Sequence, residues 1–237
     1  MSATDGTALR KVTSETGVIV REFTRPSAEI IARLGRLPIA NISDAMNKHG
    51  VLHHEIRPIW PGFHICGSAL TCGSLDLAVK IYATSLIQPG DVYVQASGGI
   101  SEYACFGELA SNGVKGRGGV GAIIDGAVRD ISGIREVGLP VFARSVTPRN
   151  YHYPFGQPYG SINQPVVCGG VLIKPGDVIV AGDDGVVAVP LEIAVQIAEA
   201  AEQIQADEEQ KRAGISSGRM PIAPIEEQLL SAGYVIR

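Results

Sequence analysis

The chain has 237 residues, of which 45% are hydrophobic and 19% charged, and its formal net charge is −4 at pH 7. These values are typical of a globular protein with a sizeable core, and they exclude a disordered chain and a strongly basic nucleic-acid binder. Residues 1–25 have mixed charge and no apolar run, and no later run reaches the roughly 20 residues of a membrane span. None of the four cysteines forms a C-x-x-C pair, so we expect reduced thiols in a cytoplasmic protein.

In the first hundred residues, helix-capping side chains stand before apolar residues at helical spacing. Ser27, Ser43 and Asp76 have this position, and each can accept a hydrogen bond from a free amide of the first turn. A Pro-Gly-Asp turn leads into an apolar run at Pro89 and again at Pro175, which indicates two similar sheet edges. We predict helices over 27–34, 43–50 and from 76 onward, and strands over 63–71 and 92–94.

The middle of the chain alternates strand and helix patterns. A glycine-rich loop over 97–99 precedes a helix that Gly107 opens, and strands and helices then alternate. A strand–helix–strand order indicates that at least part of the sheet is parallel. The predicted elements are a helix over 107–114, a strand over 119–124, a helix over 131–137 and a strand over 140–143.

The last third combines sheet signals with a C-terminal helix. We expect residues 149–164, which are aromatic and rich in Pro and Gly, to form a surface loop that either covers a site as a lid or mediates assembly. Asp184-Gly185 predicts a tight hairpin between two apolar strands, and Pro190 can begin a helix. We expect the charged cluster over 207–212 to end that helix and the tail beyond Gly214 to wrap a partner surface.

Arg129 and Asp130 are the main candidates for chemistry, because they follow an apolar strand that is expected to end in a turn at Asp125-Gly126. Ligands of α/β proteins bind at the C-terminal edge of such strands. A guanidinium and a carboxylate at this edge offer an anion clamp beside a metal ligand. The pair fits equally well a surface salt bridge with Asp130 capping the next helix, and spacing alone leaves both interpretations open.

Other motifs carry weaker signals. Residues 116–121 fit G-x-G-x-x-G but precede a strand instead of opening a helix, which disfavours dinucleotide binding. Adjacent His53 and His54 lack the spacing of a helical zinc site, and we expect solvated or hydrogen-bonded loop histidines. The amides after Gly107 can hold a carboxylate, whereas Glu208 and Glu209 fit a solvated helix face.

An ordered series of motifs over roughly residues 27–215 resembles the RraA-like family, which includes 4-hydroxy-4-methyl-2-oxoglutarate / 4-carboxy-4-hydroxy-2-oxoadipate aldolases. The resemblance implies an α/β fold, the swivelling β/β/α domain, with a mixed sheet and flanking helices. It divides the chain into an N-terminal arm (1–25), a catalytic core (26–190) and a C-terminal helix and tail (191–237) that packs on a neighbouring subunit. The motifs lie at 43–46, 107–110, 121–130, 140–144 and 165–190.

The resemblance also implies a class II pyruvate aldolase that uses Mg²⁺ or Mn²⁺ and assembles as a trimer or a dimer of trimers. Such an enzyme cleaves a 4-hydroxy-2-oxo diacid through a metal-stabilised enolate to release pyruvate, with oxaloacetate decarboxylation as a side activity. Asp130 then matches the metal ligand and Arg129 the substrate-binding arginine. The amides of Gly107, Glu108, Leu109 and Ala110 hold the pyruvate carboxylate, and Glu108, with Glu208 or Glu209 of a neighbouring subunit, orders water at the metal.

The same resemblance offers a non-catalytic alternative. Founding members of the family bind a bacterial ribonuclease and inhibit it, and they correspond to the shorter core of this chain. Those members lack the Arg-Asp pair, so the intact Arg129-Asp130 and the added C-terminal helix favour an enzyme.

Overall fold

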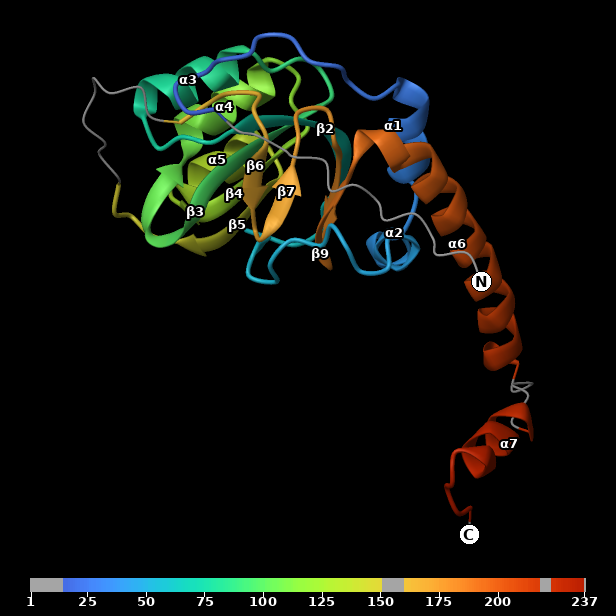
Figure 1. Cartoon of the computed structure of the whole chain (residues 1–237). Coiled ribbons are helices and arrows are strands. Elements are labelled where there is room, and N and C mark those ends of the chain that lie inside the picture. Colours follow the sequence, from blue (N-terminus) through green and yellow to red (C-terminus); the bar gives the residue numbers. More distant parts are fainter. Residues whose placement is uncertain (1–14, 151–159, 218–222, 237) are drawn as a thin grey trace.

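The computed structural model describes residues 15–150, 160–217 and 223–236. A seven-stranded mixed sheet forms its centre, with the strand order β1-β5-β4-β3-β2-β8-β9, and β6 and β7 form a separate hairpin (Figure 1). The predicted α/β class, a mixed sheet with flanking helices, is confirmed. The strands are β1 (Arg57–Pro58), β2 (His64–Cys72), β3 (Asp91–Phe106), β4 (Gly121–Val128), β5 (Val141–Val146), β6 (Val166–Cys168), β7 (Val171–Ile173), β8 (Val178–Gly182) and β9 (Gly185–Val189). The helices are α1 (Ala28–Leu34), α2 (Ile39–Ala45), α3 (Leu77–Ser85), α4 (Glu108–Gly116), α5 (Ile131–Val137), the 3₁₀ turn η1 (Leu191–Ile193), α6 (Ala194–Ser216) and α7 (Ala223–Ser231).

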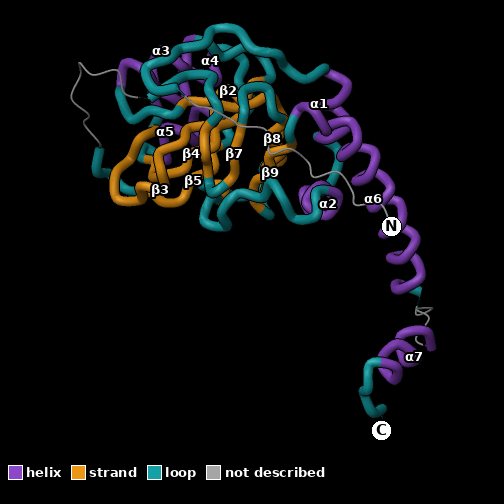
Figure 2. The backbone as a smooth tube through the Cα atoms, viewed as in Figure 1, coloured by secondary structure: helices purple, strands orange, loops and turns teal. Residues whose placement is uncertain are grey.

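Helices and loops cover the sheet in three groups. Helices α3, α4 and α5 pack on one face of the central strands, around Tyr93, Ile124 and Ile134. The β6–β7 hairpin and the segment from Leu52 to Ile56 cover the other face, and α1, α2 and α6 pack against β8 and β9 (Figures 1 and 2). Helix α6 therefore lies at the opposite end of the sheet from α4 and α5.

The central strands are parallel, as the alternating pattern predicts. Strands β2, β3, β4 and β5 pair in parallel, with α3, α4 and α5 as the crossover helices. Ser27 and Asp76 cap α1 and α3 as expected, the first accepting a hydrogen bond from Ile30 N and the second from Ala78 N and Val79 N. The β8–β9 hairpin closes between Gly182 and Gly185. Parallel pairing brings the C-terminal ends of β3 and β4 to one edge.

Two predicted breaks in the sheet are wrong. The glycine-rich segment expected as a loop lies inside β3, because Gly98 and Gly99 adopt positive φ of 68° and 76° and let the strand bulge instead of leaving the sheet. Asp125 is a buried residue within β4 rather than a turn residue, since its carboxylate accepts hydrogen bonds from Arg144 Nε and Gly169 N. A buried carboxylate with such partners can stay in a strand.

Three further boundaries differ from the prediction. Helix α2 begins after Pro38 rather than at Ser43, because the fixed φ of proline suits a helix start and Ile39 and Ile42 are buried. It ends at Ala45, since the residues at 47 and 48 are left-handed. The charged cluster does not end the C-terminal helix, which runs to Ser216 because Glu, Gln, Lys and Arg are good helix formers.

The two Pro-Gly-Asp turns are alike in structure. Asp91 Oδ2 accepts a hydrogen bond from Gln88 N at 2.9 Å, and Asp177 Oδ2 accepts one from Lys174 N at 2.7 Å. The turns begin β3 and β8, which both pair with β2, so they belong to interior strands and not to sheet edges.

Both terminal segments extend the core. The described part of the N-terminal arm lies on its own chain: Val20 N donates to Ile162 O, and Arg25 forms a bidentate ion pair with the fully buried Asp91. One face of the first half of α6 is buried, through Ala194, Ile197, Ala198 and Ala201, and the helix then leaves the core (Figure 1). The described α7 side chains are all exposed. No helix in the described ranges has the length and hydropathy needed to cross a bilayer.

Candidate functional site

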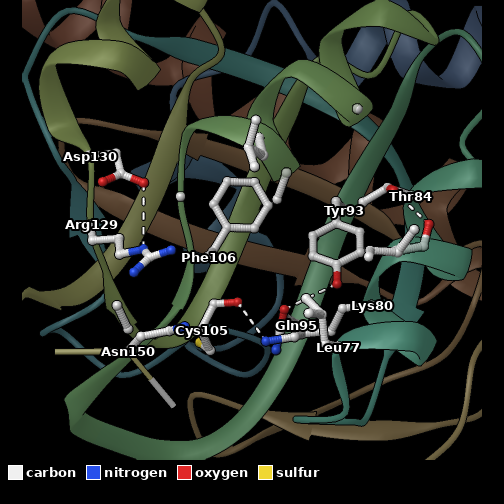
Figure 3. Close-up of a pocket in the computed structure, with 16 residues that line it drawn as sticks. Leu77, Lys80, Thr84, Tyr93, Gln95, Cys105, Phe106, Arg129, Asp130 and Asn150 are labelled. Carbon is white, nitrogen blue, oxygen red and sulfur yellow. Dashed lines mark hydrogen bonds and ion pairs between the residues drawn. The ribbon is translucent and has the colours of Figure 1, made fainter. Parts of the chain in front are cut away.

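A cavity of about 490 Å³ lies between α3, α4 and the C-terminal ends of β3 and β4 (Figure 3). Its wall is mostly apolar, and its polar groups come from separate elements. The residues that line it are Leu77, Lys80, Ile81, Thr84, Tyr93, Gln95, Ala104, Cys105, Phe106, Gly107, Leu109, Ala110, Gly113, Arg129, Asp130 and Asn150.

Arg129 and Asp130 stand at the junction of β4 and α5, on one side of Phe106 (Figure 3). Arg129 Nε lies 3.5 Å from Asp130 Oδ2, and the two side chains are 40% and 46% exposed. The terminal nitrogens of the guanidinium have no partner in the described part of the chain, so they can donate to a bound anion. Asp130 holds the N-cap position of α5, but its side chain makes no capping hydrogen bond. The carboxylate is therefore available to a ligand.

The backbone of Asp130 is left-handed, with φ 59° and ψ 44°. This conformation costs an L-residue roughly 1–2 kcal/mol, although Asp and Asn tolerate it better than most. Strained backbone is concentrated at functional sites, where the surrounding fold holds a side chain in a required direction. Here it turns the chain from β4 into α5 and leaves the carboxylate at the cavity.

Gly107 brings the start of α4 against the same pair. A Cβ at this position would lie 2.7 Å from Asp130 Oδ2 and 3.2 Å from Arg129 Cγ. Its φ of −161° suits any residue, so the close approach and not the backbone requires glycine. The first-turn amides of α4 have no acceptor within the helix, and the N-cap offers no side chain. Gly107, Leu109 and Ala110 line the cavity, so these free amides lie where a helix start can bind an anion.

The predicted acidic residues lie elsewhere. Glu108 is exposed and does not line the cavity; its carboxylate lies against Gly133 of α5, where a Cβ would meet Glu108 Oε2 at 2.5 Å. Glu208 accepts a hydrogen bond from Asn41 Nδ2 at 3.2 Å, and Glu209 accepts one from Gln205 Nε2 at 3.2 Å. Both belong to α6, at the far end of the sheet from α5 (Figure 1). Neither reaches the cavity of its own chain.

Sequence reasoning missed the polar groups on the other side of Phe106 (Figure 3). Lys80 Nζ donates to Cys105 O at 3.1 Å, and burial lowers the pKa of this lysine. Tyr93 OH donates to Gln95 Oε1 at 3.0 Å, and Gln95 Nε2 donates to Ser74 O at 3.1 Å. Burial raises the pKa of Tyr93, so its hydroxyl stays neutral. In the sequence, the one sign of a role for Lys80 is that it is the only charged residue within α3.

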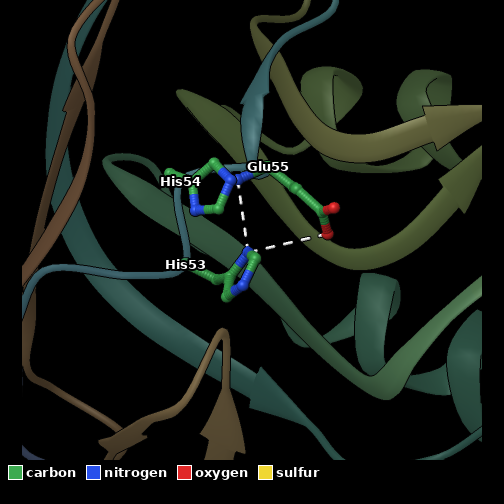
Figure 4. Close-up of side chains that lie close together, drawn as sticks. All are labelled: His53, His54 and Glu55. Atoms are coloured by element: carbon green, nitrogen blue, oxygen red, sulfur yellow. Dashed lines mark hydrogen bonds and ion pairs between the residues drawn. The ribbon is translucent and has the colours of Figure 1, made fainter.

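A cluster of potential metal ligands lies on a separate loop (Figure 4). His53, His54 and Glu55 are exposed, and one ligand atom of each lies within 4.8 Å of the others. However, Arg144 Nη1 donates to His53 Nδ1 at 3.0 Å and to Glu55 Oε2 at 2.8 Å. These two acceptor atoms are therefore already hydrogen-bonded to Arg144, and the cluster agrees with hydrogen-bonded loop histidines.

Asp130 fits a divalent cation better. Its half-exposed carboxylate is the only acidic group among the described residues of the cavity wall. Mg²⁺ and Mn²⁺ prefer oxygen ligands, and Mg²⁺ keeps several waters beside one or two carboxylates, whereas zinc sites usually recruit nitrogen or sulfur. A single exposed carboxylate of this kind would suit a hydrated Mg²⁺ or Mn²⁺ ion better than a zinc ion.

Comparisons with known proteins show the family and the fold of this chain. A family model described as Aldolase/RraA matches residues 39–188. A protein of Halalkalibacterium halodurans named "Putative 4-hydroxy-4-methyl-2-oxoglutarate aldolase" is 31% identical over 88% of this chain and 99% of its own length. The crystal structure of Streptomyces coelicolor RraAS2, described as an unusual member of the RNase ES inhibitor RraA protein family, matches with a TM-score of 0.69 at 29% identity, over 80% of this chain and 99% of that one. An uncharacterised Pseudomonas syringae structure shares the fold, with a TM-score of 0.71 at 24% identity over 84% of this chain and 97% of its own.

Proposed function

Because this chain belongs to the Aldolase/RraA family, we propose that it is a divalent-cation-dependent lyase that cleaves a 4-hydroxy-2-oxo diacid and releases pyruvate. The substrate is of the 4-hydroxy-4-methyl-2-oxoglutarate or 4-carboxy-4-hydroxy-2-oxoadipate type. The observation that carries the proposal is the contact between Gly107, Arg129 and Asp130 at the cavity. The name of the Halalkalibacterium relative supports the reaction class.

Each of these groups has a distinct role in the proposed reaction. The first-turn amides of α4 bind the carboxylate next to the 2-oxo group, and the free nitrogens of Arg129 stabilise negative charge on the 2-oxo oxygen. Asp130 holds the Mg²⁺ or Mn²⁺ ion, which supplies a Lewis acid for the 2-oxo acid. The C3–C4 bond breaks as the 4-hydroxyl gives its proton to a water molecule and becomes a carbonyl group, and C3 of the pyruvate enolate then takes a proton back from that water.

Oxaloacetate decarboxylation follows as a side activity. Loss of carbon dioxide from oxaloacetate produces the same pyruvate enolate, so the residues that stabilise it in one reaction stabilise it in the other. Both activities should respond in the same way to substitution of Arg129 or Asp130.

We also propose that the protein is a homo-oligomer, a trimer or a dimer of trimers, with a C-terminal glutamate at a neighbour's site. The second half of α6 leaves its own core, and Glu208 and Glu209 lie far from their own cavity (Figure 1). A role for either glutamate, beside Glu108, in ordering water at the cation therefore requires a second copy of the chain. Sedimentation of the intact protein and of a chain ending at residue 203 tests this assembly.

A ribonuclease-binding regulator is the second candidate, favoured by the likeness to the Streptomyces RraAS2 structure. One experiment separates the two. Pyruvate release from 4-hydroxy-4-methyl-2-oxoglutarate is measured before chelation, after EDTA, and after Mg²⁺ or Mn²⁺ is restored. We expect chelation to abolish release and either cation to recover it. Release that survives EDTA contradicts the cation-dependent mechanism, and ribonuclease inhibition without turnover of any 2-oxo acid identifies the regulator.

A further inference from the structure

We propose that Lys80 binds the carboxylate of the substrate that is remote from the 2-oxo group, and that it makes this cavity selective for dicarboxylates. The proposal rests on the proposed function for the 2-oxo acid class. It adds a specificity-determining residue on α3, outside the Arg129-Asp130 site.

Lys80 has no acidic partner in the described part of the chain. Its Nζ donates to one neutral acceptor, the carbonyl oxygen of Cys105, at 3.1 Å. The nearest acidic residue along the helix, Asp76, uses its carboxylate to cap α3 through Ala78 N and Val79 N. An ammonium group has three donors, so Lys80 keeps donors for a ligand in the cavity that it lines.

The surroundings of Lys80 favour an anion. Lys80 is half-buried, and the buried Tyr93 belongs to the same cavity wall, so part of the hydration of the ammonium group is lost. Burial accordingly lowers the pKa of Lys80, and the nearby Asp76 carboxylate opposes this effect only in part. A carboxylate bound beside Nζ would recover the electrostatic energy that burial removes.

Two positively charged side chains line the cavity, and they come from different elements. Lys80 lies on α3, Arg129 follows β4, and Phe106 lies between their positions (Figure 3). No other lysine or arginine belongs to the described wall, and the surface between the two is largely apolar. A ligand with a carboxylate at each end and an uncharged middle matches this distribution. When one carboxylate binds the start of α4 and the 2-oxo oxygen binds Arg129, the second carboxylate of the ligand points toward Lys80.

Binding measurements test the proposal without requiring turnover. The probes are 2-oxoglutarate, a dicarboxylate without the 4-hydroxyl group that cleavage needs, and pyruvate, a monocarboxylate. Calorimetric titrations with Mg²⁺ present compare the wild type, Lys80→Met and Lys80→Arg. The matched control is Lys115→Met, because Lys115 also donates to a carbonyl oxygen, that of Gly138, but does not line the cavity.

We expect Lys80→Met to weaken 2-oxoglutarate binding by roughly 10- to 100-fold, the range for a charge-assisted hydrogen bond, and to change pyruvate binding less than about 3-fold. Lys80→Arg should recover part of the loss, and Lys115→Met should match the wild type. Equal weakening of both ligands, or unchanged 2-oxoglutarate affinity, overturns the proposal. So does an adduct at Lys80 after borohydride reduction with pyruvate, which would make the lysine an imine-forming nucleophile. Selective binding without any pyruvate release would instead refute the proposed function and leave the role of Lys80 intact.

Discussion

Replacing Gly107 by alanine tests whether the start of α4 sets the position of the Asp130 carboxylate. The added Cβ would lie 2.7 Å from Asp130 Oδ2, whereas ordinary contacts begin at 3.4 Å. The carboxylate or the helix start must therefore shift by about 0.7 Å, and misplacement of a reacting group by about 1 Å costs on the order of 100-fold in rate. We expect kcat/KM for pyruvate release to fall roughly 10- to 100-fold, equivalent to about 1.4–2.7 kcal/mol.

The fold should tolerate this change. The extended φ of Gly107, −161°, is open to alanine, and the displaced Asp130 side chain is 46% exposed. We expect the free energy of unfolding, measured in urea, to change by less than about 1 kcal/mol. Gly116→Ala is the control, because a Cβ on this residue of the same helix meets nothing within 4 Å. Pyruvate release at wild-type rates by Gly107→Ala would refute the role assigned to the close approach.

Three further predictions concern stability. Arg25→Ala leaves the fully buried Asp91 without its bidentate partner, so urea denaturation should show a loss of roughly 2–4 kcal/mol; a loss below about 0.5 kcal/mol would contradict it. Asp130→Gly should be more stable than Asp130→Ala by about 1 kcal/mol, because φ is 59° there, and equal stability would argue against backbone strain. The pKa of Lys80 is lowered from 10.5 on folding, so the folded state binds this proton less tightly and stability falls as pH falls from 10.5 through the lowered pKa. Lys80→Met should weaken the dependence of the free energy of unfolding on pH in this alkaline range, and an unchanged pH dependence would contradict the burial of the charge.

Local signals predicted the elements that depend on nearby residues. Ser27 and Asp76 cap their helices with hydrogen bonds that span two or three residues, and the parallel order of strands brought Arg129 and Asp130 to the sheet edge near Gly107. Capping residues can be recognised in the sequence itself, and the alternation of strand and helix patterns indicates which strands are parallel.

Features that depend on distant contacts were missed. Asp125 reads as a turn residue, yet Arg144 and Gly169 satisfy its carboxylate inside β4. Burial of Ile39 and Ile42 overrides the capping signal of Ser43. Lys80 stands in a helix pattern that gives no sign of the Cys105 carbonyl or of the cavity beyond it.

The most direct test of the central claim is a Mg²⁺ titration of EDTA-treated wild type and Asp130→Asn, read as the rate of pyruvate release. Asparagine tolerates the left-handed backbone of residue 130 and keeps its size, so the substitution removes only the carboxylate charge. We predict that Mg²⁺ restores the wild type and that Asp130→Asn remains at least about 100-fold less active while unfolding at the wild-type urea concentration. Full recovery of Asp130→Asn at the same Mg²⁺ concentration would contradict a cation held by Asp130.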